Sequence, residues 1–187
     1  MSLDLERELR ERGALLRGHF RLSSGRHSDR FIQKFRILED PKLVEPVARA
    51  IAGAFADARP TVVLSAAVGG IVLGYEVARA LNVKGIFAEK EAGVPVLRRG
   101  FHLSADDRVL VVEDVITTGG SVREVIGIAQ AAGASVIGVG AIVRRGEADF
   151  GVPTVALLEM PIVSCDEGEC PQCKRGTPLD DPGSRRR

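Results

Sequence analysis

The chain has 187 residues, 45% of them hydrophobic and 27% charged, so it can bury one sizeable core and we expect one main domain. The 26 basic and 25 acidic residues nearly cancel, which argues against a nucleic acid or an anionic membrane as the main partner. The start is densely charged, and no apolar run reaches the ~18 residues of a membrane span. We therefore expect a cytoplasmic protein.

Residues 1–36 are predicted to form a small unit ahead of the main domain. Leucines at helical spacing predict a short helix over 3–12, which Gly13 can end. Two short extended pieces between residues 20 and 33 flank a polar turn at 23–26, a pattern typical of a hairpin.

Residues 37–158 are predicted to form an open α/β domain with a mostly parallel sheet flanked by helices. The strands are short and continuously apolar, as in sheets that are covered on both faces. Residues 159–187 are rich in Pro, Gly and charge and are predicted to form an irregular tail. In chain order we predict a helix at 41–58, strand 61–64, helix 71–80, strands 85–88 and 108–112, helix 121–132, and strands 135–143 and 154–158.

The most informative segment is Val109–Ser121, VLVVEDVITTGGS, in which a buried strand leads through two acids into a Thr-Thr-Gly-Gly-Ser loop. Gly119 and Gly120 allow the backbone to approach a ligand closely, and the start of the following helix offers unpaired amides with partial positive charge. Ser121 and Glu124 have the spacing of a capping box. These features predict a site for a phosphate monoester.

Glu113 and Asp114 follow the same strand at the edge where open α/β sheets bind ligands. Two acids beside a phosphate site are suited to the hydroxyl groups of a sugar. The simpler alternative is a solvated acidic turn before an ordinary capped helix. The glycine patterns of Walker and dinucleotide-binding loops are absent from the segment.

This segment closely resembles the phosphoribosyl pyrophosphate motif of the type I phosphoribosyltransferases. The resemblance implies that the two acids hold the ribose 2- and 3-hydroxyls while residues 117–121 wrap the 5-phosphate. Residues 64–70, LSAAVGG, are similar to the family's pyrophosphate loop, although orotate enzymes often carry a lysine in place of Gly69. The implied contacts to phosphoribosyl pyrophosphate are Ala67, Val68, Gly69, Gly70, Lys90, Glu113, Asp114, Val115, Ile116, Thr117, Thr118, Gly119, Gly120 and Ser121.

Residues 18–34 resemble the segment with which orotate phosphoribosyltransferases cover the base. The resemblance implies orotate contacts from Ser23, Phe31 and Ile32, together with Thr117 of the phosphate loop. Ser23 stands where the better-known bacterial enzymes have a lysine. The simpler alternative for this segment is a surface hairpin.

Arg144 follows the predicted strand 135–143 and is expected beside the phosphate loop. A guanidinium there can form two parallel hydrogen bonds with the carboxylate of orotate, and the family uses an arginine at the matching position. Arg145 is adjacent, so the assignment can shift by one residue.

Orotate enzymes also have a mobile loop that closes over the reacting atoms, to which residues 89–100 correspond. The implied catalytic residues are Lys90, Arg98 and Arg99 of this loop, together with Asp114. The resemblance implies a homodimeric enzyme that uses magnesium (Mg2+) to transfer ribose 5-phosphate from phosphoribosyl pyrophosphate to orotate. The alternatives are an enzyme of the same type for another base, such as a purine, and a non-catalytic sensor of phosphoribosyl pyrophosphate.

Cys165, Cys170 and Cys173 form a C-x4-C-x2-C pattern near the C-terminus. Three thiolates can bind zinc, but a tetrahedral site normally has a clear fourth ligand, which the pattern does not supply. Free thiols or a local disulfide are the alternatives.

Overall fold

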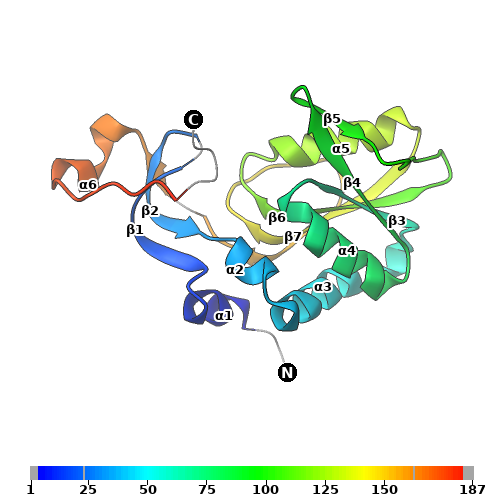
Figure 1. Ribbon diagram of the computed structural model, residues 1–187, viewed down its shortest axis with the longest axis horizontal. Helices are drawn as coiled ribbons and strands as arrows, with labels where there is room; N and C mark the ends of the chain where they lie inside the picture. The colour runs from blue at the N-terminus through cyan, green and yellow to red at the C-terminus, as the bar shows by residue number, and fades with distance from the viewer. Residues whose placement is uncertain (1–3, 23, 162, 183–187) are drawn as a thin grey trace.

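The computed structural model describes residues 4–22, 24–161 and 163–182, so Ser23 lies outside the described residues. It has a large lobe around a six-stranded sheet and a small lobe, the hood, around the three-stranded sheet β1-β2-β9 (Figure 1). None of the helices within the described ranges has both the length and the apolar character needed to cross a membrane. In chain order the helices and strands are α1 (Leu5–Glu11), β1 (Leu15–Arg21), β2 (His27–Ile32), α2 (Phe35–Leu38), α3 (Pro41–Phe55), β3 (Val62–Ala66), α4 (Gly69–Leu81), β4 (Lys84–Glu91), β5 (Val94–Leu97), β6 (Arg108–Ile116), α5 (Gly120–Ala131), β7 (Ser135–Arg144), β8 (Thr154–Glu159), β9 (Ser164–Cys165) and α6 (Pro171–Lys174).

The six-stranded sheet confirms the predicted α/β class. Its order is β5-β4-β3-β6-β7-β8, and every neighbouring pair is parallel except β4 and β5. Because side chains alternate along a strand, Val63 faces one core with α3 and α4, whereas Val62 and Leu64 face a second core with α5. Both faces of the sheet are therefore covered, as the apolar strands predict.

Three predicted features of the large lobe are wrong in detail. The strand predicted to end at residue 112 continues to Ile116, so the two acids lie within β6. The helix α5 begins after Gly119 without a side-chain cap, so Ser121 and Glu124 do not form a capping box. Residues predicted as a mobile loop at 89–100 include the β4–β5 hairpin, in which Lys90 pairs with Pro95.

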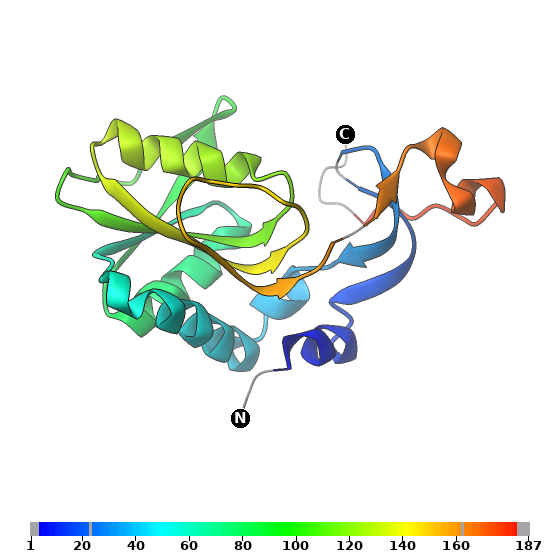
Figure 2. The same ribbon diagram turned by 180° about the vertical axis from the view of Figure 1, so that it is seen from behind.

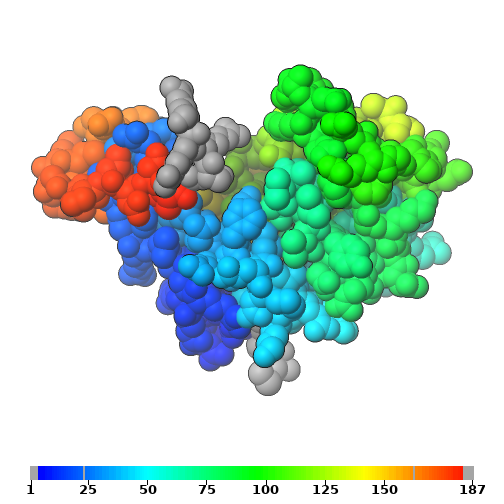
Figure 3. Space-filling model, in the orientation of Figure 1, coloured from blue at the N-terminus to red at the C-terminus, as the bar shows by residue number. Residues whose placement is uncertain are grey.

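The hood is built from both ends of the chain. The predicted N-terminal hairpin is confirmed as β1 and β2, and β9 from the predicted irregular tail pairs with β2. Further along, the amide of Asp180 donates to the carbonyl of His19 at 2.8 Å. Figure 3 shows this C-terminal segment, orange to red, packed against the blue N-terminal hairpin, and Figure 2 shows β6 and β7 pointing toward the hood with their carboxyl ends.

Candidate functional site

The candidate site lies where the sheet changes direction. The strands β3 and β6 are parallel neighbours, with Ser65 opposite Val112. The chain leaves β3 through α4 toward β4 on one side, and leaves β6 through α5 toward β7 on the other. In open α/β sheets the crevice at such a switch point is the usual ligand site. The loops at 67–70 and 117–121 are thereby brought side by side.

The loop at 117–121 presents a row of available backbone amides. Within the described part of the chain, no hydrogen bond is donated by the N–H group of any residue from 117 to 121. Thr117, Thr118 and Ser121 are exposed, so their hydroxyl groups are accessible as well. An anion placed in the loop can accept hydrogen bonds from these groups at the positive end of α5. The loop therefore offers the donors that the predicted phosphate cradle requires.

The shape of this loop is held by the segment that follows β7. Gly119 has a φ of +79°, and a Cβ atom there would lie 2.7 Å from the ring of Phe150. The guanidinium of Arg123 donates to the carbonyl of Thr118 at 2.7 Å and lies 5.2 Å from the centre of the same ring. A glycine is therefore required at 119 for both the backbone conformation and the packing. The amides are preorganised before any ligand arrives.

Glu113 and Asp114 are buried acids, with 8% and 1% of their surfaces exposed. Each accepts a hydrogen bond from the backbone amide of the next residue, Glu113 Oε1 from Asp114 N at 3.0 Å and Asp114 Oδ1 from Val115 N at 2.6 Å. Burial, and then the charge of Asp114, raise the pKa of Glu113 to about 8. Glu113 therefore keeps its proton at neutral pH in the free protein.

Lys34 is a site residue that sequence reasoning missed. Its Nζ lies 2.8 Å from Asp114 Oδ2, close enough for an ion pair, although Oδ2 receives no aligned hydrogen bond from the described residues. A Cβ atom on Gly69 would overlap Asp114 Oδ2 and lie 2.7 Å from Lys34 Nζ. The glycine thus leaves room for a lysine that arrives from a different segment. The only signal in the sequence was that position 69 holds a glycine, whereas orotate enzymes often have a lysine there.

The two arginines after β7 have different surroundings. Arg144 forms an ion pair with Glu159, 2.9 Å away, and is thus engaged on the outer strand β8. Arg145 donates its backbone amide to Ile116 at 2.9 Å, next to the phosphate loop. Burial lowers the pKa of its guanidinium, and its Nε is buried with no hydrogen-bond partner among the residues described. Of the two, Arg145 is the arginine whose guanidinium has no acidic partner among the described residues.

The other predicted site residues are only partly brought together. Ile32 is buried in the core, so its side chain is not available to a base, and the ring of Phe31 packs 5.7 Å from that of Phe20. The three cations predicted in the loop at 89–100 are engaged with acids of the same lobe. Lys90 pairs with Glu124, Arg98 with Glu89 and Glu91, and Arg99 with Glu89.

The chain is similar to known proteins in its sequence. The phosphoribosyl transferase domain matches residues 35–152. The chain is 52% identical over 176 residues to the orotate phosphoribosyltransferase of Pelotomaculum thermopropionicum, covering 93% of each protein. It is 51% identical over 172 residues to that of Caldanaerobacter subterraneus subsp. tengcongensis, covering 91% of this chain and 90% of the relative.

Solved structures show the same fold. Orotate phosphoribosyltransferase from Aeropyrum pernix superposes with a TM-score of 0.71 at 30% identity, covering 83% of this chain and 93% of that chain. An adenine phosphoribosyltransferase from Thermoanaerobacter pseudethanolicus superposes with a TM-score of 0.62 at 17% identity, covering 70% of this chain and 88% of that chain. At this lower identity, the second comparison is informative about the fold alone.

The raised pKa of Glu113 predicts a pH-dependent stability. The folded protein keeps this proton up to a pH of about 8, whereas the unfolded chain releases it near 4.5, so the stabilisation is complete below that pH and is lost as the pH rises to about 8. Relative to Glu113→Gln, the free energy of unfolding should fall by up to about 1.4 kcal/mol per pH unit. Urea unfolding at several pH values measures this slope, with the exposed Glu147→Gln as control. An equal slope in wild type and Glu113→Gln would contradict the assignment.

Proposed function

This chain belongs to the orotate phosphoribosyltransferase family, and on that premise we propose that it transfers the 5-phosphoribosyl group from phosphoribosyl pyrophosphate to orotate. The products are orotidine 5'-phosphate and pyrophosphate, in the synthesis of UMP. The observation that carries the proposal is a row of backbone amides at 117–121 that donate no hydrogen bond to any described residue. They follow directly after β6, which holds the two buried acids. That arrangement suits a phosphate and the hydroxyl groups of the sugar attached to it.

In this reaction a ring nitrogen of the base forms a bond to C1 of the ribose while the bond from C1 to pyrophosphate breaks. Positive charge develops on the ribose ring in the transition state, so a carboxylate of the Glu113–Asp114 pair next to the ribose would stabilise it. The amides at 117–121 hold the 5-phosphate and thereby orient C1 toward the base. No covalent enzyme intermediate is required.

We assign the pyrophosphate to the loop at 67–70 and to Lys34. The loop residues Gly69 and Gly70 are at the start of α4, where their amides find no backbone acceptor among the described residues. Lys34 brings a positive charge to the position beside Gly69. It therefore supplies, from the segment before α2, the cation that related enzymes often carry on the loop itself.

We also propose Mg2+ as the cofactor. The donor groups of the crevice are oxygen atoms, among them Asp114 Oδ2, to which no described residue donates an aligned hydrogen bond, and the exposed hydroxyl of Thr117. Such hard donors suit Mg2+, which usually binds through few carboxylates and through substrate phosphates. Asp114 would hold the ion together with substrate oxygens. When bound, Mg2+ supplies neutralisation of charge on the departing pyrophosphate.

For orotate recognition we propose Arg145 rather than Arg144. Arg145 lies beside the phosphate loop and has a buried Nε without a partner among the described residues, whereas Arg144 is paired with Glu159. An orotate carboxylate would form an ion pair with the Arg145 guanidinium and thereby compensate the cost of burying its charge. The roles of Lys90, Arg98 and Arg99 in closing the site remain predictions from the family resemblance.

A homodimer is supported by apolar side chains exposed on one part of the large lobe. Val72 and Tyr75, on α4, are 45% and 64% exposed, and Phe35 on the adjoining α2 is 44% exposed. Large apolar groups gathered in this way are typical of protein interfaces. We propose that α2 and α4 meet the same surface of a second copy.

The function is tested by offering a panel of bases, namely orotate, uracil, adenine and xanthine, with labelled phosphoribosyl pyrophosphate. We expect turnover of orotate that depends on Mg2+ and little turnover of the other bases. Turnover of adenine or xanthine without orotate would reject the proposed base. Binding of phosphoribosyl pyrophosphate without turnover of any base would indicate a sensor in place of an enzyme.

Arg145→Ala should reduce kcat/KM for orotate by about 10- to 100-fold, which is the factor expected from the loss of one or two charged hydrogen bonds. The KM for phosphoribosyl pyrophosphate should change little, because the phosphate loop is intact. Arg144→Ala is the matched control and should have the smaller effect on orotate, since it loses only the pair with Glu159. Steady-state kinetics with each substrate varied in turn measures both. A larger loss of kcat/KM for orotate in Arg144→Ala than in Arg145→Ala would show that Arg144 binds the orotate carboxylate.

Lys34→Ala should reduce kcat/KM for phosphoribosyl pyrophosphate by about 10- to 100-fold, because a charged contact with pyrophosphate is lost. Lys42→Ala, which removes an exposed lysine at the start of α3, is the control. Inhibition by added pyrophosphate should weaken in the first variant alone. Unchanged pyrophosphate inhibition in Lys34→Ala would show that Lys34 pairs with Asp114 and does not bind pyrophosphate.

Tyr75→Glu should convert a dimer of 20.0 kDa chains into monomers, because a charge would be buried in the proposed interface. Val163→Glu, at a residue that is 83% exposed in the tail, is the control and should leave the dimer intact. Light scattering during gel filtration measures the mass. A wild-type protein with the mass of one chain would exclude this interface.

A further inference from the structure

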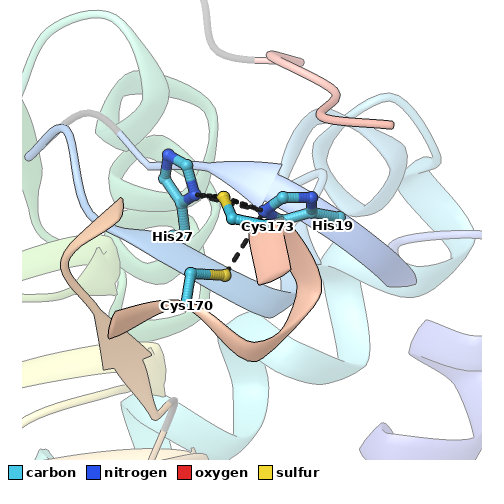
Figure 4. A group of neighbouring side chains, drawn as sticks. All are labelled: His19, His27, Cys170 and Cys173. Carbon is cyan, nitrogen blue, oxygen red and sulfur yellow. Dashed lines mark hydrogen bonds between the residues drawn. The ribbon is translucent and has the colours of Figure 1, made fainter. Parts of the chain in front are cut away.

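Four metal-binding side chains meet inside the hood, outside the large lobe that carries the phosphate loop. His19 and His27 come from β1 and β2, whereas Cys170 directly precedes α6 and Cys173 lies within it (Figure 4). One potential ligand atom from each residue lies within 4.8 Å of all the others. Cys165, which the sequence pattern grouped with the other cysteines, is not a member and instead approaches the carbonyl of His27 at 3.9 Å.

The spacing of these atoms matches a tetrahedral zinc ion. With Zn–N near 2.05 Å and Zn–S near 2.3 Å, ideal tetrahedral angles place two nitrogens about 3.3 Å apart and a nitrogen and a sulfur about 3.6 Å apart. His19 Nε2 and His27 Nδ1 are 3.1 Å apart. The nitrogen–sulfur distances are 3.4 Å and 3.6 Å from His19 Nε2 to Cys170 and Cys173, and 3.2 Å from His27 Nδ1 to Cys173.

The surroundings orient the ligands from outside. His19 Nδ1 lies 2.9 Å from the carbonyl of Thr177, to which it can donate, so the lone pair of Nε2 faces the cluster. This is the usual arrangement around a metal-bound histidine. His19, His27 and Cys170 are 3%, 1% and 2% exposed, so solvent is largely excluded. Gln172, between the two cysteines, donates to the carbonyl of Gly18 at 2.9 Å and anchors α6 on β1.

A cluster held only by hydrogen bonds explains these contacts less well. Once His19 donates through Nδ1, its Nε2 is an acceptor that faces His27 Nδ1 and two sulfur atoms. If His27 donates through Nδ1 to His19 Nε2, its own Nε2 becomes a buried acceptor with no partner among the described residues. If His27 is protonated on Nε2 instead, the two facing ring nitrogens are both acceptors, and only thiols, which are weak donors, lie beside them. A cation at the centre of the cluster would attract the lone pairs of all four ligand atoms. Two nitrogens and two sulfurs in a tetrahedral arrangement select zinc among the common divalent ions.

We propose that His19, His27, Cys170 and Cys173 bind one structural zinc ion, which fastens the C-terminal segment to the N-terminal hairpin. Four protein ligands complete the coordination, so no position is left open for a substrate. The two-residue strand β9 and the short helix α6 have little core of their own. Metal binding would contribute free energy of folding to this segment in place of buried apolar surface. The proposal does not depend on the reaction that the large lobe catalyses.

The direct test is metal analysis of the full chain, prepared without a histidine tag from zinc-supplemented cells and washed with a mild chelator. We expect one zinc per chain. Cobalt reconstitution of the same protein, after metal removal, should give the intense thiolate-to-cobalt absorption and the visible bands of a tetrahedral site. Folded protein that retains no zinc and gives no such spectrum with cobalt would overturn the proposal.

Variants identify the ligands. Cys170→Ser and His27→Ala should each lose bound zinc, whereas Cys165→Ser, the matched control, should keep one zinc per chain. Limited proteolysis should cut the C-terminal segment faster in the two ligand variants and in chelator-stripped wild type. Loss of zinc from Cys165→Ser, with retention in Cys170→Ser, would overturn the ligand assignment. If the ligand variants do not fold, the cobalt spectrum of wild type still decides.

Discussion

The burial of two neighbouring carboxyl groups at the end of β6 is the constraint on which the site depends. A buried acid must keep its proton or find a compensating charge, and this pair does both. Burial holds a proton on Glu113, whereas Asp114 is compensated by Lys34 at 2.8 Å. Gly69 must lack a side chain because Asp114 and Lys34 occupy the space. The pyrophosphate loop, the hood and the acids are therefore coupled through one ion pair.

The same constraint explains how the crevice is prepared for a highly charged substrate. In the proposed reaction its acids, within the strand, would face the positive charge that develops on the ribose, and its amides and Lys34 would hold the phosphates. The phosphate loop is supported from behind by Phe150 and Arg123, so its amides do not collapse onto their own backbone. Binding energy is then available for orientation, since the loop does not have to be rearranged.

Most of the large lobe could be predicted from the sequence, because its strands are apolar runs and the phosphate loop is a continuous segment. The capping box failed because Gly119 takes a left-handed conformation and starts α5 one residue early. Lys34 and the two histidines of the hood were missed because their partners lie far along the chain: 80 residues separate Lys34 from Asp114, and 151 separate His19 from Cys170. The local hydrophobic pattern of a sequence contains no information about pairs that lie so far apart in the chain. The choice of Arg145 over Arg144 likewise needed the position of Glu159.

The hood draws its third strand from the far end of the chain, and this has a consequence for biogenesis. During translation, β1 and β2 leave the ribosome early, whereas β9 and α6 emerge only with the last residues. Contacts between such distant segments form late and slowly. All the strands of the large lobe precede β9 and α6 in the chain, so the lobe beside the crevice is the last part of the described fold to be completed.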